Sequence, residues 1–437
     1  MRSRFGIRAK IAHCVGAPDS ALGEPEFECF DDGLLIVESG RIDWCGEYSG
    51  ATDQGLDQIE VLDRRSQLLV PGFIDCHVHY PQIDVIGSYG EQLLEWLQTY
   101  TYPAELRYAD HAYAAAAANF FVAELLRNGT TTAMVFPTVH PHSVDCVFEA
   151  ASAVNMRVIS GKVMMDRNSP KGLCDTPKSA YSDSRDLLER WHGNGRALYA
   201  ITPRFAATSS PAQLAAAGRL AQEFPDSYVH THLSESHAEI SWTRELFPQA
   251  SDYLNVYERY GLVRERSIFA HCIHLSDSEI ARFAKARAGA AFCPSSNLFL
   301  GSGLFDAGKM SGEGVEFGLG SDVGAGTSLS MLQCAGDAYK VLQMRGQSLP
   351  AMLALYYLTL GAARALCLDD RLGNFALGKE ADFLLLDASA TPLTEWRTSK
   401  SENLPETLFA LMTMGDDRAI AETYVNGKSV HLATPQY

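Results

Sequence analysis

The sequence contains no cysteine pair in a CxxC arrangement, although ten cysteines are spread along its 437 residues. The absence of such a pair argues against a redox dithiol and against a zinc site built from paired thiolates. No closely spaced disulfide framework is present either, and Cys76, Cys272, Cys293 and Cys334 lie in apolar surroundings. This usage is typical of reduced, buried thiols, so we expect a reducing compartment, the cytoplasm.

Positive charge and long apolar runs are also scarce. The formal net charge is −17, with 36 Lys and Arg against 53 Asp and Glu, which argues against a nucleic-acid or anionic-membrane partner. The most apolar long stretch, residues 112–126, contains Asn119 and Glu124 and is too short to span a bilayer. The Arg-rich start lacks the apolar core of a signal peptide. A transit peptide is one interpretation of it, but the extended pattern of residues 5–15 favours a first strand.

From about residue 71 the chain alternates short apolar runs with amphipathic stretches. The apolar runs predict eight strands, within residues 73–79, 130–139, 157–165, 197–205, 227–235, 267–275, 289–297 and 316–322. Helices are expected between them, at residues 105–128, 142–154, 176–192, 211–224, 276–287 and 328–345. This rhythm is typical of an α/β fold of the (β/α)8 TIM-barrel type, and a doubly wound open sheet is the alternative.

The two ends of the chain have a different pattern. Ser39-Gly40 and Asn426-Gly427 each lie between extended runs and predict hairpin turns. Strands at both termini predict one small β-domain assembled from residues 1–70 and 376–437. The barrel is then expected to occupy residues 71–375.

Side chains suited to metal binding stand at the ends of several predicted strands. His77 and His79 are two residues apart on the first strand and therefore share a face. The fifth strand ends with His232 and Glu235, the sixth with His271, and the eighth with Asp322. Active sites of such barrels are built at these strand ends. Imidazoles with a carboxylate fit Zn²⁺, while Fe²⁺ and Mn²⁺ remain alternatives by residue type.

Taken one at a time, these residues have plainer explanations. A single buried histidine is more often a packed interior residue than a ligand, and a lone aspartate after a strand is usually a turn former or a helix cap. His230 shares a face with His232 but lies one layer deeper, so we interpret it as structural. It is their joint occurrence at the ends of four strands that favours a metal site.

These strand ends resemble the amidohydrolase superfamily, whose members are metal-dependent hydrolases on a (β/α)8 barrel with a flanking β-sandwich. Within it, the segments HVHYPQ, LLEWLQTYTYPAE, ITPRF, HLSE and GLGSDVGAGTSLSM resemble the guanine deaminases. The resemblance covers residues 70 to about 345, and GKEADFLLLD extends it to the C-terminal end.

The resemblance implies hydrolytic deamination of guanine to xanthine and ammonia by a metal-activated water. Its metal ligands fall on His77, His79, His232 and Asp322, and one Zn²⁺ per chain is expected because the fourth strand has no lysine to bridge a second ion. Glu235, His271 and Asp322 take the catalytic positions, with Glu235 as the proton shuttle. Gln82, Arg204 and Phe205 take the positions that contact the purine, and a homodimer is implied as the assembly.

Three other functions are alternatives to guanine deamination. A deaminase or chlorohydrolase of the same superfamily would keep the metal ligands but act on another aminated heterocycle, and should differ at Gln82 and Arg204. A non-catalytic scaffold on this fold would lack some ligands. The other zinc deaminase fold needs a P-C-x-x-C segment, which the sequence does not contain. The aromatic stretch at residues 93–105 could form a lid over the pocket or simply pack at the barrel mouth.

Overall fold

The computed structural model describes residues 4–433 of the chain. The chain divides into two compact units: one comprises Met1–Ile74, Glu124–Thr131 and Ser330–Tyr437, and the other Asp75–Ala123 and Thr132–Leu329. The predicted domain boundaries differ mainly in assigning residues 330–375 to the barrel, and they remain a proposal. Residues 1–3 and 434–437 of the predicted terminal domain lie outside the described residues.

The expected (β/α)8 barrel is confirmed. Its strands follow one another around the sheet in sequence order, whereas a doubly wound sheet would reverse direction at a switch point. The strands are β5 (Phe73–His79), β6 (Thr130–Phe136), β7 (Arg157–Ser160), β9 (Leu198–Pro203), β10 (Tyr228–Leu233), β11 (Ser267–His271), β12 (Gly289–Phe292) and β13 (Phe317–Leu319). Nearly every residue of these strands is buried, as expected for strands covered on both faces.

The third predicted strand, residues 157–165, is interrupted. It forms β7 and a two-residue strand β8 (Val163–Met164), which pairs with β9. Gly161 lies at the break, where a Cβ atom would come within 1.7 Å of the carbonyl oxygen of Ala200. The chain therefore passes so close to β9 that only glycine fits there.

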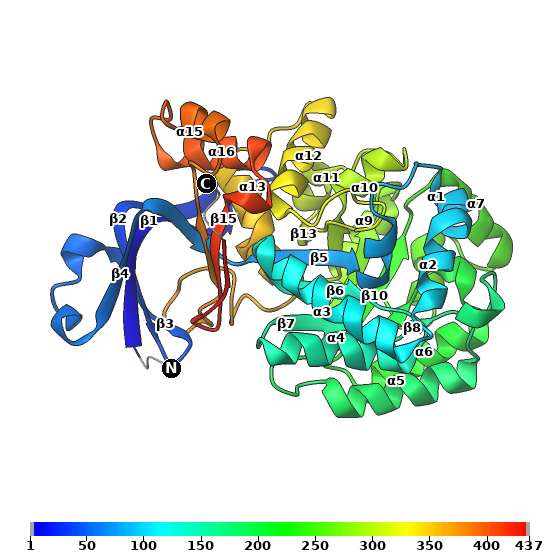
Figure 1. Ribbon diagram of the computed structural model, residues 1–437. Helices are drawn as coiled ribbons and strands as arrows, with labels where there is room; N and C mark the ends of the chain where they lie inside the picture. The colour runs from blue at the N-terminus through cyan, green and yellow to red at the C-terminus, as the bar shows by residue number, and fades with distance from the viewer. Residues whose placement is uncertain (1–3, 434–437) are drawn as a thin grey trace. The chain divides into compact units, whose positions relative to one another are not determined.

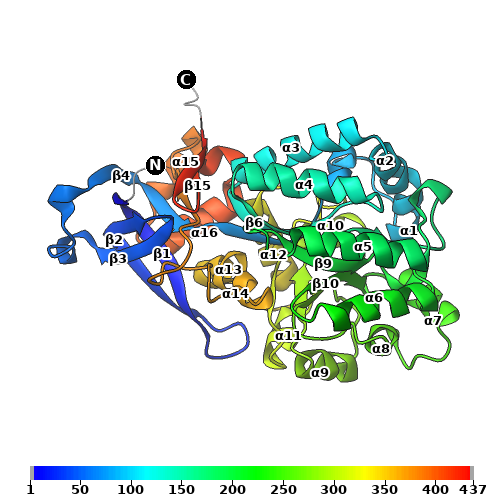
Figure 2. The same cartoon turned by 90° about the horizontal axis from the view of Figure 1, so that it is seen from below.

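Helices lie outside the barrel strands, and α3 to α6 follow one another along its outer side (Figures 1 and 2). Their bounds are α1 (Leu93–Trp96), α2 (Tyr102–Arg107), α3 (His111–Arg127), α4 (Pro141–Ala153), α5 (Pro177–Trp191), α6 (Pro211–Glu223), α7 (His237–Leu246), α8 (Tyr253–Glu258), α9 (Asp277–Lys285), α10 (Pro294–Phe299) and α11 (Ala307–Gly312). A π-helical turn, η4 (Leu97–Thr101), joins α1 to α2, and a 3-10 helix, η3 (Tyr80–Val85), follows β5.

The single helix expected at residues 105–128 is wrong, because the chain breaks between α2 and α3. The amide of Tyr108 bonds back to the carbonyl of Glu105 at 3.1 Å, which closes the end of α2. The side chain of Asp110 then accepts the amide of Tyr113 at 3.0 Å, which starts α3. Apolar periodicity runs through both helices and hides this change of direction.

The small β-domain built from both ends is confirmed. Within the described residues its seven strands form one mixed sheet, in the order β16-β15-β14-β4-β1-β2-β3. The strands are β1 (Arg4–Pro18), β2 (Pro25–Glu38), β3 (Arg41–Glu47), β4 (Glu60–Pro71), β14 (Phe383–Leu386), β15 (Ile420–Val425) and β16 (Lys428–Leu432). The same unit contains α12 (Met331–Met344), α13 (Ala351–Leu358), α14 (Leu360–Ala365), α15 (Pro392–Thr398) and α16 (Leu404–Met414).

Both predicted hairpin turns of this sheet are confirmed. Ser39 and Gly40 have φ angles of 51° and 82°, and Asn426 and Gly427 have φ angles of 49° and 72°. Two consecutive positive φ values are the signature of a type I′ turn, whose twist matches that of the flanking strands.

The first and last barrel strands meet through the segment that follows β13. The amide of Asp322 donates to the carbonyl of His77 at 2.8 Å, and the amide of His79 donates to the carbonyl of Val323 at 2.9 Å. Below them the buried carboxylate of Asp75 accepts the amide and the hydroxyl of Ser321, at 3.0 and 2.5 Å. These contacts close the barrel at its carboxyl end.

No helix among the described residues is long and apolar enough to cross a membrane.

Candidate active site

Four ligand atoms converge at the carboxyl ends of β5, β10 and β13. His77 Nε2 lies 3.1 Å from His79 Nε2 and 3.2 Å from Asp322 Oδ1. His79 Nε2 lies 3.3 Å from both Asp322 Oδ1 and His232 Nε2. Metal–nitrogen bonds of about 2.0–2.1 Å in a tetrahedral site place ligand atoms roughly 3.3 Å apart, so these spacings fit one ion. His77, His79, His232 and Asp322 therefore form a group that could hold a metal.

Two of these imidazoles are oriented by contacts of their second nitrogen. His232 Nδ1 lies 2.7 Å from the carbonyl oxygen of Arg204 and donates to it. The proton of His232 is thus on Nδ1, and the lone pair of Nε2 faces the ligand group. His77 Nδ1 lies 2.8 Å from Nε2 of His230. The ring of Phe136, with its centroid 4.4 to 5.3 Å from the imidazoles of His77, His79, His230 and His232, packs against all four.

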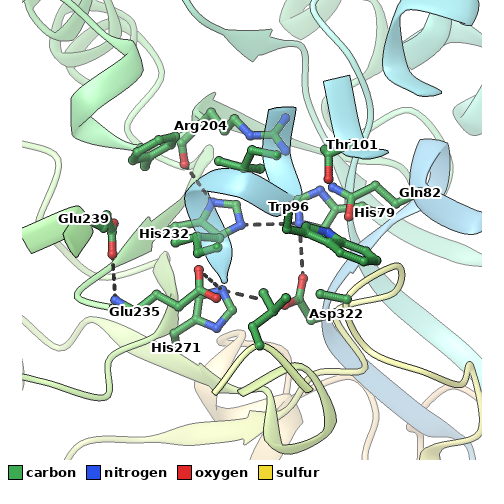
Figure 3. A pocket seen from close by; sticks show the side chains of 15 residues that line it. His79, Gln82, Trp96, Thr101, Arg204, His232, Glu235, Glu239, His271 and Asp322 are labelled. Carbon is green, nitrogen blue, oxygen red and sulfur yellow. Dashed lines mark hydrogen bonds and ion pairs between the residues drawn. The ribbon is translucent and has the colours of Figure 1, made fainter. Parts of the chain in front are cut away.

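Glu235 and His271 lie beside the ligand group. His271 Nε2 is 3.3 Å from Glu235 Oε2 and 3.7 Å from Asp322 Oδ2, while its Nδ1 contacts Asn297 Oδ1 at 2.9 Å. The hydroxyl of Ser302 donates to Glu235 Oε1 at 3.3 Å. In the view of Figure 3, Arg204 lies above the imidazoles of His79 and His232, with Glu235, His271 and Asp322 below them. The structure thus brings all the predicted catalytic residues together.

A second glutamate holds the backbone of Glu235. Glu239 Oε2 accepts the amide of Glu235 at 2.8 Å and that of Ser236 at 3.3 Å, and the phenol of Tyr253 donates to Glu239 Oε1 at 2.6 Å. Glu239 is the third residue of α7 and forms a capping box with Ser236. The cap of this helix therefore also fixes the position of Glu235.

Several site residues adopt backbone angles that are unfavourable for side chains with a Cβ atom. Ser234, His271 and Asp322 have φ angles of 52°, 73° and 48°. Each such residue costs about 1–2 kcal/mol, which the surrounding packing must offset. These turns come one residue after β10, at the last residue of β11 and three residues after β13, where they aim Glu235, His271 and Asp322 at a common point.

Burial determines the protonation state of the imidazoles in this ligand group. It lowers the pKa of His77, lowers that of His79 to about 3 and places that of His232 well below its usual range. Although burial opposes it, the contacts with His77 and His79 hold the pKa of Asp322 well below its usual range. Three neutral imidazoles and a carboxylate are the forms that bind a divalent ion.

Glu235 is shifted in the opposite direction. Burial raises its pKa well above the usual range, and the nearby charges of Asp322 and Glu239 raise it further. A carboxyl group with a raised pKa can take up a proton at neutral pH and release it to a reacting group.

Gln82, Arg204 and Phe205 line the same cavity. Arg204 is 2% exposed, and its Nη1 donates to both oxygens of Glu105, at 2.7 and 2.8 Å. The amide nitrogen of Gln82 makes a long contact of 3.5 Å with Glu105, and its Oε1 accepts the amide of Gly324 at 3.3 Å. Burial raises the pKa of the Glu105 carboxyl, while the guanidinium of Arg204 opposes this shift.

The aromatic stretch at residues 93–105 supplies one wall of the cavity through Leu93, Trp96, Leu97 and Thr101. Trp96 is 1% exposed, and its ring lies 4.8 Å from that of Tyr100 and 5.7 Å from that of Phe299. The stretch is therefore packed over the cavity. Whether it opens as a lid stays a prediction.

Sequence reasoning missed Glu105, Glu239 and Asp75, and interpreted His230 as purely structural. The quoted segment LLEWLQTYTYPAE contains Glu105 as its last residue, but no periodicity marked it as a partner of Arg204, 99 positions away. Glu239 could have been found, because Ser236 and Glu239 have the spacing of a capping box directly after Glu235.

The chain matches the family described as "Amidohydrolase family" over residues 68–430. It is 54% identical to a protein of Escherichia coli K12 named "Guanine deaminase", over 92% of this chain and 91% of that protein. The solved structure titled "E. coli Guanine Deaminase" superposes with a TM-score of 0.94, at 48% identity over 99% of this chain and 100% of that chain. A guanine deaminase of C. acetobutylicum, solved with guanine bound in its active site, gives a TM-score of 0.89 at 25% identity, over 98% of this chain and 100% of the other.

Proposed function

This chain belongs to the amidohydrolase family, and on that premise we propose that it hydrolyses guanine to xanthine and ammonia. The observation that carries the proposal is a four-atom ligand group placed between a buried carboxyl group, Glu235, and a buried arginine, Arg204. Alignment of almost the whole chain with guanine deaminases supports the choice of substrate.

Zn²⁺ is the ion we assign to His77, His79, His232 and Asp322, one per chain. The support is the ligand spacing of 3.1 to 3.3 Å, the three imidazoles and the single carboxylate. Fe²⁺ and Mn²⁺ also accept this set of residue types. When bound, the ion lowers the pKa of water and so makes it a nucleophile at neutral pH.

Each proton transfer of the reaction is carried out by a residue in or beside the ligand group. Glu235 removes one proton from the attacking water and passes it to the ring nitrogen next to C2. The water oxygen forms its bond to C2, the bond from C2 to the exocyclic nitrogen breaks, and ammonia leaves. Asp322 can accept the second proton of the water through Oδ2 and pass it to the departing amine, which restores the carboxylate. His271 can donate a hydrogen bond to the oxygen that develops at C2.

Residues at the other end of the cavity contact the purine and select it. Arg204 donates to the carbonyl oxygen at C6, and Gln82 has both a donor and an acceptor for the ring edge. Phe205 is an apolar wall beside the ring and is 4% exposed. A heterocycle that leaves the buried donors of Arg204 unpaired binds less well, which disfavours other aminated rings.

The proposal also covers the assembly of the protein and its location in the cell. The sequence resemblance supports a homodimer, which sedimentation equilibrium would test. All ten cysteines are free thiols, which supports a cytoplasmic location.

The test is the ultraviolet change when the purified, zinc-loaded protein is mixed with guanine. Formation of xanthine and ammonia is expected in wild type, and the Glu235→Gln variant should lose about 100- to 10,000-fold in rate while keeping one zinc per chain. No turnover of guanine by a zinc-loaded protein would exclude this substrate. Triazines, pterins and other aminated heterocycles would then be compared, since the same ligand group serves all of them.

A further inference from the structure

The guanidinium of Arg204 is held on one side by a single carboxylate. Within residues 4–433 its hydrogen bonds to protein all leave from Nη1 and all end on Glu105. Nη2 and Nε therefore remain for a ligand in the cavity that Arg204 lines. Tyr102 stands on the flank of the guanidinium, with its ring centroid 5.5 Å from the Cζ atom. The arginine thus has one fixed edge and one edge facing the cavity.

Glu105 also defines which way the amide of Gln82 points. A carboxylate only accepts hydrogen bonds, so the atom of Gln82 that faces Glu105 must be nitrogen. The opposite atom faces the amide of Gly324 and must be oxygen. Gly324 can approach this closely because it has no side chain: a Cβ atom there would meet the carbonyl oxygen of Gln82 at 2.4 Å. The orientation of Gln82 is therefore determined at both ends.

Glu105 itself is completely buried, on α2, and does not line the cavity. Away from water, an unpaired carboxylate or guanidinium would be costly. A pair of this kind positions its arginine strongly, because any rotation of the guanidinium breaks charged hydrogen bonds that water does not replace.

We propose that Glu105 is the positioning residue for purine selectivity: by fixing Arg204 it aims two N–H donors at the C6 carbonyl of the substrate. This inference rests on the proposed function. A ring with a carbonyl at C6, such as guanine, satisfies the donors, whereas 2-aminopurine carries hydrogen at C6 and leaves them unpaired. The amino group that is hydrolysed is the same in both rings, which differ at the C6 carbonyl and at the hydrogen on the adjacent N1.

The experiment measures kcat/KM for guanine and for 2-aminopurine in wild type, Glu105→Gln, Arg204→Met and the double variant. In Glu105→Gln the ratio of the two values should fall about 10- to 100-fold, mostly through KM for guanine, because hydrogen bonds from a charged donor are lost. In the Arg204→Met background most of the effect of Glu105→Gln should disappear, since the positioned group is already absent. Zinc content should stay at one per chain in all variants.

Two further variants keep the test decisive. Glu105→Asp retains the charge but withdraws the carboxylate by one methylene, so it serves if Glu105→Gln is too unstable to purify. Glu279→Gln is the matched control: Glu279 is a buried glutamate that caps α9 through Ser276, outside the catalytic cavity. An unchanged guanine to 2-aminopurine ratio in a folded, zinc-loaded Glu105→Gln or Glu105→Asp protein overturns the proposal.

A binding measurement separates this inference from the proposed reaction. Hypoxanthine has the C6 carbonyl but no amino group at C2, and unsubstituted purine has neither. Calorimetry should show that wild type prefers hypoxanthine and that Glu105→Gln loses most of this preference. If wild type shows the preference but turns over no guanine, the proposed function fails while the role of Glu105 stands. Equal preference in wild type and variant overturns the role of Glu105.

Discussion

His77 Nδ1 lies 2.8 Å from Nε2 of His230, directly behind the metal-ligand group. For Nε2 of His77 to face a metal, its proton must be on Nδ1, and Nδ1 then donates to His230. The proton of His230 is therefore on its own Nδ1. Within the described residues that atom is buried and has no hydrogen-bond partner. An unsatisfied N–H of this kind costs about 1–3 kcal/mol, so the orientation of His77 is obtained at a loss of stability.

We expect His230→Leu to weaken Zn²⁺ binding by about 10- to 100-fold, because His77 loses the acceptor that fixes its tautomer. His230→Gln should lose less, since its side-chain oxygen can reach the position of the imidazole Nε2. The measurement is competition for zinc against a chelator of known affinity. Equal zinc affinity in wild type and His230→Leu would show that His230 only fills space.

Removing Asp75 should destabilise the barrel at its closing contacts. Asp75 accepts the amide of His77 at 3.1 Å in addition to the amide and hydroxyl of Ser321. We expect Asp75→Ala to cost roughly 2–4 kcal/mol in unfolding free energy, because it leaves buried donors unpaired. Asp75→Asn keeps an oxygen for the two amides and should cost less. Urea unfolding of both variants gives the comparison, and equal costs would contradict this explanation.

Chelation should lower the thermal stability of the protein. An ion that binds only the folded state adds about 3–4 kcal/mol when present at 100 to 1,000 times its dissociation constant. The thermal midpoint is therefore expected to fall when zinc is stripped and to recover when zinc is returned. Asp322→Ala lacks one ligand and is the control, in which both shifts should be much smaller. If the thermal midpoint of wild type is the same with and without zinc, these four residues do not hold a metal.

The stability of the terminal β-domain should fall in acid because of His13. Burial, with a smaller contribution from the charge of Lys379, lowers the pKa of His13 to about 4. Its Nδ1 accepts the amide of Phe375 at 3.4 Å, which requires an unprotonated nitrogen. The carboxylate of Glu28 lies 3.1 Å from Nε2 of His13 and favours the protonated imidazole. The Glu28 side chain is 50% exposed, so solvent and salt weaken this attraction.

The direction in which stability changes with pH follows from the lowered pKa of His13. Between pH values of about 6.5 and 4 the unfolded chain binds a proton that the folded chain does not, so stability falls as the pH falls through this window. The full effect is about 3 kcal/mol. His13→Gln has no such proton, so its stability difference from wild type should shrink as the pH is lowered. Unfolding by urea at several pH values measures this, and a constant difference would show that His13 does not titrate there.

Local patterns were sufficient to predict the barrel strands and the residues at their ends. Alternation and apolar runs locate β5, β10 and β11, and the order of strands then places His77, His232 and His271 at one end of the barrel. The same patterns missed the break between α2 and α3, because both helices carry continuous apolar periodicity and only Asp110 marks the new start.

The residues that orient the site could not be predicted in this way. Glu105 meets Arg204 across 99 positions and His230 meets His77 across 153, so each contact depends on how several elements pack. Propensity and periodicity describe single elements. They carry no information about which buried polar group faces which, and a buried glutamate has the same local pattern whether it caps a helix or holds an arginine.

The contacts between β5 and the segment after β13 have a consequence for the order of events during synthesis. His77 and Asp322 are 245 positions apart and meet only when the last barrel strand has docked on the first. A nascent chain that has not yet reached residue 322 can present three of the four ligands at most. The complete ligand group therefore forms only when the barrel closes, and protein arrested before that point lacks one of the four ligands.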